Sequence, residues 1–216
     1  MFAARNAFQT GAKIITPVTF SAYTNSATTS VTLPTHAVGN IIVMMASSTS
    51  NLPTAPSASG TVPTWTTIRA TSYFDGQYPI EFRVAYAIAT ATNHTSGTWT
   101  GANRLIAAVF SGNRTSSPIG ANAFTGSDAP SSAAMNAPAI TLTDTAGTSA
   151  IVQFWTQGFI ANFSSTTVPS GYTKRFGGFL QMFSTKDITT SDGVVNITGP
   201  LSTPWGAVQF EILAAT

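Results

Sequence analysis

The alternation of hydrophobic and polar positions along the chain predicts β-strands throughout. Between Glu81 and Thr90, the apolar side chains Phe82, Val84, Tyr86 and Ile88 fall on one face. A period of two is typical of a half-buried strand. Further strands are predicted at 14–23, 28–34, 41–47, 65–74, 97–101, 104–112, 139–143, 149–157, 171–176, 179–187, 193–198 and 205–214. With no long helical pattern beside them, these segments predict an all-β fold, an antiparallel β-sandwich that is jelly-roll-like.

The most apolar run of the chain extends from Ile41 to Ala46. As a helix these residues would be about 9 Å long, far short of the roughly 30 Å of a membrane's hydrocarbon core. The run lacks a clear alternation, which is typical of a central strand covered on both faces. We therefore predict a buried strand here and no membrane segment.

The order of short motifs is similar in the two halves of the chain. Ile41 is followed 110 residues later by Ile151, Pro63 is followed 106 residues later by Pro169, and Leu105 is followed 102 residues later by Ala207. Either a duplication or two sheets built from similar hairpins would produce this echo. Both origins predict two pseudo-similar halves in one sandwich. We therefore expect a single domain over 14–216, preceded by an N-terminal arm over 1–13.

Residues 111–138 are rich in serine, alanine, asparagine, glycine and proline. This composition predicts one long loop, and loops of such length are uncommon and tend to be functional or to face solvent.

Composition supports strands and excludes several classes of function. Charged residues make up only 7% of the chain, whereas it contains 23 serines and 36 threonines, and threonine suits a pleated surface. The net charge is +2 and the basic residues are scattered, so no nucleic-acid surface is predicted. Without cysteine, the chain has neither disulfides, thiolate catalysis nor cysteine-bound metal.

Catalytic groups are sparse. The two histidines, His36 and His94, lie in polar turns far apart in the sequence, and we expect both to be exposed to solvent. Most of the seven carboxylates occupy turn sequences, and Glu81 and Glu211 are expected to face solvent from their strands. A glycosidase would need two carboxyls flanking one groove. The pattern instead predicts a protein that is not an enzyme, with no cofactor and no metal.

Aromatic residues supply the candidate contact residues. The four tryptophans lie in or beside predicted strands, which favours core packing over stacking on sugar rings. Three phenylalanines lie in loop-like sequence, where an exposed ring would mark a contact surface. The predicted partner interface combines these with three residues of the arm, and comprises Phe2, Arg5, Phe8, Phe124, Phe159 and Phe163.

Several short motifs resemble those of β-sandwich proteins from tailed bacteriophage particles. The matching segments are Gly39–Ala46, Val62–Trp65, Arg83–Ala87, Gly97–Thr100 and Leu105–Phe110, with a looser match over 147–213. This resemblance implies a structural protein of the phage virion with a jelly-roll-like sandwich that assembles as a homotrimer. It supplies no catalytic residues.

The resulting hypothesis is a capsid decoration, or cement, protein. Its partners would be the major capsid protein or other virion subunits, bound through the arm and one set of loops, and its location would be the virion. Two alternatives stay open: a minor tail or baseplate protein, and a carbohydrate-binding adhesin module.

Overall fold

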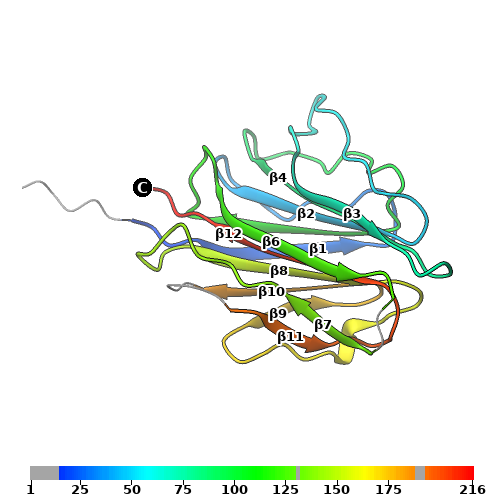
Figure 1. Ribbon diagram of the computed structural model, residues 1–216. Coiled ribbons are helices and arrows are strands. Elements are labelled where there is room, and N and C mark those ends of the chain that lie inside the picture. The colour runs from blue at the N-terminus through cyan, green and yellow to red at the C-terminus, as the bar shows by residue number, and fades with distance from the viewer. Residues whose placement is uncertain (1–14, 130–131, 188–192) are drawn as a thin grey trace, which may run out of the picture.

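The computed structural model describes residues 15–129, 132–187 and 193–216, and these residues form an all-β sandwich (Figure 1). The predicted arm, with Phe2, Arg5 and Phe8, lies outside the described residues. Apart from a single turn of 3-10 helix, η1 (Phe163–Ser165), every regular element in the described part is a strand. The predicted all-β class and antiparallel sandwich are confirmed.

Two five-stranded antiparallel sheets form the body of the sandwich. The first sheet has the order β1-β5-β2-β4-β3, with bounds β1 (Thr19–Ser26), β2 (Ile41–Ser48), β3 (Thr66–Tyr73), β4 (Ile80–Ile88) and β5 (Arg104–Ser111). The second has the order β6-β12-β8-β10-β9, with bounds β6 (Ile119–Ser127), β8 (Ala150–Gln157), β9 (Thr173–Gly177), β10 (Gln181–Asp187) and β12 (Trp205–Ile212). A two-stranded sheet of β7 (Ala134–Ala137) and β11 (Val195–Thr198) completes the fold.

The two large sheets have the same connectivity. Substituting β6 for β1, β8 for β2, β9 for β3, β10 for β4 and β12 for β5 converts the first strand order into the second. The sequence echo agrees, since Ile41 and Ile151 lie on the equivalent strands β2 and β8. Each sheet is therefore built from one continuous half of the chain, a more local connectivity than that of a two-Greek-key jelly roll. A shared order of five strands favours duplication over a coincidental likeness of hairpins.

The main hydrophobic core lies between the two sheets. Alternate residues of the central strands contribute to it, among them Ile41, Val43 and Met45 on β2, and Val152 and Phe154 on β8. The intervening residues of β2 and β8 are also buried, because other segments cover the outer face of each sheet. The expectation of a central strand covered on both faces is confirmed for the apolar run.

Different structures cover the two outer faces. Over the first sheet lie coil segments that include Val31, Leu33 and Trp99. Over the second lie β7 and β11, seen at the bottom of Figure 1, together with η1. This is the main departure from equivalence between the halves.

Cation–π pairs link the edge strands of the two sheets on both sides of the sandwich. The guanidinium of Arg69 on β3 lies 3.1 Å from the ring centroid of Phe124 on β6. On the other side, Arg175 on β9 lies 4.3 Å from the ring centroid of Phe20 on β1. Because β3 corresponds to β9 and β6 to β1, these contacts occupy equivalent places in the two halves. Each contributes about 0.5–1 kcal/mol where it is partly exposed.

Some predicted elements differ from the observed ones. Segments 28–34, 97–101 and 139–143 are not strands but largely coil that packs on the outer faces. Conversely, the predicted long loop at 111–138 contains β6 and β7. Glycine and alanine give β6 little intrinsic strand propensity, and its pairing with β12 decides its conformation.

Candidate interaction surface

Several loops gather at the end of the sandwich where β3 joins β4 and β9 joins β10, which we call the distal end (Figure 1, right). The last residues of β6 and β8 reach the same end, because Ser127 and Gln157 both pair with Trp205. Thr16 and Ala215 form a bridge at the opposite end. The two termini of the described chain thus lie away from the distal end.

Four of the large apolar side chains that remain exposed in the described residues lie at the distal end. Phe159 and Ile160 follow β8, Phe74 follows β3, and Phe179 lies between β9 and β10. Their exposed fractions are 43% for Phe159, 64% for Ile160, 53% for Phe74 and 51% for Phe179. Together with Tyr78, we call these residues the distal apolar patch. Exposed apolar residues gathered from separate loops are typical of a contact surface.

The backbone holds Phe159 in an unusual conformation. Its φ is +62°, in the left-handed region that side-chain-bearing residues rarely adopt. The preceding amide, that of Gly158, donates to the carbonyl of Pro204 at 2.8 Å, and the Phe159 ring contacts Tyr78 with centroids 4.4 Å apart. Strain of this kind persists only where surrounding contacts impose it, and it is concentrated at functional positions.

A lysine fixes the loop that follows the patch. The ammonium of Lys174 on β9 donates to the carbonyls of Phe163, Ser164 and Thr166 at 2.7–2.8 Å. Burial lowers the pKa of Lys174 from its ordinary value, while three carbonyl acceptors satisfy its three N–H groups. The loop after β8 is thereby tied to the edge of the second sheet.

The predicted interface residues separate into different environments. Phe159 is exposed, as its loop position predicted. Phe124 is also exposed, but on strand β6 under the Arg69 guanidinium rather than in a loop. Phe163 is fully buried, so the exposure expected from its loop-like sequence is wrong. Asn162 caps η1 by accepting from the Ser164 amide, and the resulting turn places Phe163 in the core.

All four tryptophans belong to the core. Trp99, Trp155 and Trp205 are buried, and the half-buried Trp65 packs edge-on against Trp99 with ring centroids 5.4 Å apart. The preference for core packing is confirmed, and a sugar-stacking platform made of tryptophan is absent.

The two histidines lie together, contrary to expectation. Their rings stack with centroids 5.9 Å apart and an interplanar angle of 11°. His36 is buried, so its predicted exposure is wrong. The Nδ1 of His94 bonds to the Thr61 carbonyl, and its Nε2 accepts from the amides of Thr90 and Ala91. Because backbone groups bond to both ring nitrogens of His94, this ring organises the turns at Thr61 and at Thr90–Ala91.

Two carboxylates, Asp144 and Glu211, also come together. Glu211 is fully buried, so its predicted exposure is wrong. One oxygen, Oε2, accepts from the amides of Ala121 and Thr143, and Oε1 accepts from the amide of Asp144. The Ser149 hydroxyl lies between the two carboxylates, 2.8 Å from Glu211 Oε1 and 3.0 Å from Asp144 Oδ2. With its oxygens turned to backbone amides in a closed interior, Glu211 acts as a structural anchor for the 143–149 loop.

The Asp144 carboxylate gives stability a dependence on pH. Desolvation raises its pKa, but hydrogen bonds from Thr148, Ala146 and Ser149 outweigh it and lower the pKa from 3.8 to about 2. Since the folded pKa lies below the unfolded one, this contribution is present above about pH 4 and is lost as pH falls towards 2. Allowing for the exposure of the carboxylate, we expect D144N to lower the free energy of unfolding by about 1 kcal/mol at neutral pH.

Urea unfolding of D144N and the wild type at pH 7, 4 and 2 checks this expectation. The difference in free energy of unfolding should shrink as the pH falls through this window. A difference that stays constant from pH 7 to pH 2 would contradict the assignment.

No family model, curated protein or solved structure matches the chain. Within residues 15–129, 132–187 and 193–216, no three histidine or acidic side chains group closely enough to hold a metal ion. Nor does the described part contain a helix long and apolar enough to cross a membrane. The distal apolar patch is the strongest candidate for a contact surface, because its exposed side chains come from separate loops.

Proposed function

We propose that this chain is a non-enzymatic structural subunit of a tailed-phage virion, with capsid decoration as its role, and that it binds neighbouring subunits through the distal apolar patch. The observation that carries this proposal is the gathering of Phe74, Phe159, Ile160 and Phe179 at one end of the sandwich. The motifs that resemble phage sandwich proteins supply the virion context. The predicted homotrimer and the contact of the N-terminal arm belong to the same proposal.

The chemistry of the described residues supports a binding role over a catalytic one. Both ring nitrogens of His94 and the oxygens of the Asp144–Glu211 pair are engaged by backbone and hydroxyl groups. A low charge content also suits contact by shape and apolar burial, since few charges need to be desolvated at an interface.

The test is co-sedimentation with undecorated capsids of the phage that encodes the chain, alongside light scattering of the isolated protein. We expect binding to capsids and a solution mass three times that of the 22.4 kDa chain. The double variant F159S/I160S should bind at least about tenfold more weakly, because it removes exposed apolar area that contacts the partner. The matched control is V38S. Val38 is also an exposed apolar residue, but it precedes β2 at the opposite end of the sandwich.

The outcomes separate the alternatives. Sedimentation with tails instead of capsids would replace decoration by a minor tail role. A stable monomer that binds neither particle would overturn the virion proposal. Equal binding by F159S/I160S and the wild type would show that the distal apolar patch is not the surface that binds the virion.

A further inference from the structure

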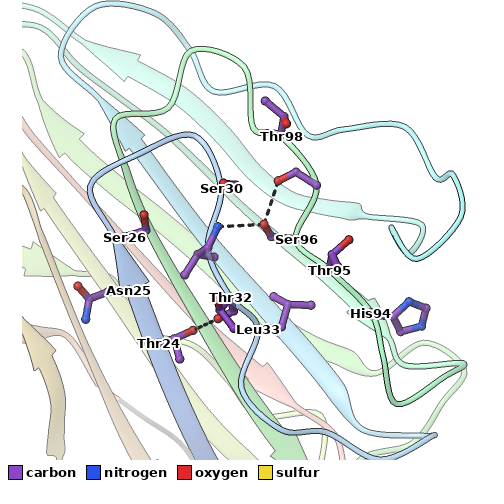
Figure 2. A pocket seen from close by; sticks show the side chains of 12 residues that line it. Thr24, Asn25, Ser26, Ser30, Thr32, Leu33, His94, Thr95, Ser96 and Thr98 are labelled. Carbon is purple, nitrogen blue, oxygen red and sulfur yellow. Dashed lines mark hydrogen bonds between the residues drawn. The ribbon is translucent and has the colours of Figure 1, made fainter.

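A groove lined mostly by polar residues lies against the outer face of the first sheet (Figure 2). It has a volume of about 650 Å³ and lies between the end of β1, the segment 30–33 and the segment 94–98. This volume falls within the usual range for sites that hold small molecules. None of the residues that line it is acidic, lysine or arginine.

Hydrogen bonds inside the wall fix the shape of the groove. The Ser96 hydroxyl is buried, accepts from the Val31 amide at 3.0 Å and donates to the Gly97 carbonyl at 2.9 Å. The Thr24 hydroxyl donates to the Thr32 carbonyl, and all three bonds are drawn in Figure 2. Beneath them, Val31 packs into the outer core. The two segments are therefore joined before any ligand arrives, which lowers the entropy cost of binding.

The groups left available in the groove are neutral and polar. The side chains of Asn25, Ser30, Thr32 and Thr98 are exposed and make no hydrogen bond with other described residues. Each can both donate and accept. His94 has both ring nitrogens engaged, so its polar atoms are already satisfied.

These groups favour a glycan over a peptide or a charged ligand. An extended peptide is bound mainly by main-chain hydrogen bonds. Here the carbonyls of Thr29 and Thr32 and the amide of Val31 are already paired inside the protein. A charged ligand would find no opposite charge in the lining. Sugar hydroxyls, which also donate and accept, match the side chains that remain.

We propose that this groove binds a neutral oligosaccharide through the side chains of Asn25, Ser30, Thr32 and Thr98. Asn25 and Ser26 at one end of the groove also line a smaller pocket with Phe179 of the distal apolar patch. The oligosaccharide site does not depend on the proposed virion role. Binding is weak, since no exposed aromatic ring lines the groove. Avidity from several subunits in one assembly would strengthen it.

The test is an NMR titration of the ¹⁵N-labelled chain with maltohexaose and with cellohexaose. We expect the amide signals of Ser30, Thr32 and Thr98 to shift with at least one of these neutral probes. Removing one hydroxyl, in T32V or in T98V, should weaken binding about fivefold, which corresponds to one net hydrogen bond. The control variant T141V removes an exposed hydroxyl elsewhere and should leave the titration unchanged.

Hexagalacturonate and a glycine–serine hexapeptide serve as comparison ligands. The proposal is overturned if neither neutral probe shifts the groove signals. It is also overturned if the acidic sugar or the peptide binds more tightly than both neutral probes, or if T32V and T98V bind like the wild type.

Discussion

Replacing Glu211 by alanine is expected to lower the free energy of unfolding by at least about 3 kcal/mol. The substitution leaves the amides of Ala121, Thr143 and Asp144 without their acceptor, and each unsatisfied buried donor costs about 1–3 kcal/mol. It also opens a cavity beside Ile151, since Glu211 and Ile151 are paired across β12 and β8. Urea unfolding followed by tryptophan fluorescence measures the loss.

The matched control is Glu81, the other strand glutamate, which is half-exposed and makes no side-chain hydrogen bond with other described residues. E81A should change stability by no more than about 0.5 kcal/mol. If E211A does not fold, E211Q provides the measurement, because it keeps the volume and one acceptor oxygen and should show an intermediate loss. Equal stability of E211Q and E211A, or a loss in E211A no larger than that in E81A, would contradict the anchoring role.

The second large effect is expected at Gly206. Its substitution by alanine should lower the free energy of unfolding by about 3 kcal/mol. Gly206 on β12 pairs with Gly126 on β6, and the stacked rings of Phe82 and Tyr73 lie over this pair. A Cβ at Gly206 would lie 2.2 Å from Cε1 of Phe82. Phe82 is fully buried, so its ring has no space into which to move.

A double-mutant cycle tests this steric explanation. F82L makes room beside residue 206, so F82L/G206A should be more stable than the sum of the single losses predicts, by about 1–2 kcal/mol. The control is G193A, where an added Cβ meets no atom within 4 Å. Additive losses in the cycle would show that the cost of G206A does not come from the Phe82 ring.

The pattern of apolar residues was sufficient for the strands whose side chains are large. The run from Ile41 and the alternation at Phe82 and Val84 each correspond to an observed strand, β2 and β4. Strand β6 could not be found this way, because its glycines and alanines carry little strand preference of their own. Gly126 is instead required by the Tyr73 ring from the other sheet, and Gly120 by the Glu211 carboxylate, and such requirements have no local signal.

Candidate contact residues were predicted less well than the fold. Exposure was correct for Phe159 and Phe124 and wrong for Phe163, although Phe159 and Phe163 stand four residues apart in the same loop. The decisive feature is the cap at Asn162, whose hydrogen bond to the Ser164 amide turns the chain. The residues Phe74 and Phe179 were not selected, since their exposure depends on which loops meet at the distal end.

By itself, the sequence determined the all-β class, the absence of cysteine chemistry and the likeness of the two halves, because composition and periodicity act locally along the chain. Only the tertiary structure decided which side chains meet. It buried Glu211, stacked His36 on His94, gathered the distal apolar patch and left the groove hydroxyls unpaired. The physical reason is that strand order and sheet packing bring together residues far apart in the sequence, as where Gly206 meets the Phe82 ring. Burial and hydrogen-bond partners follow from those contacts rather than from neighbours in sequence.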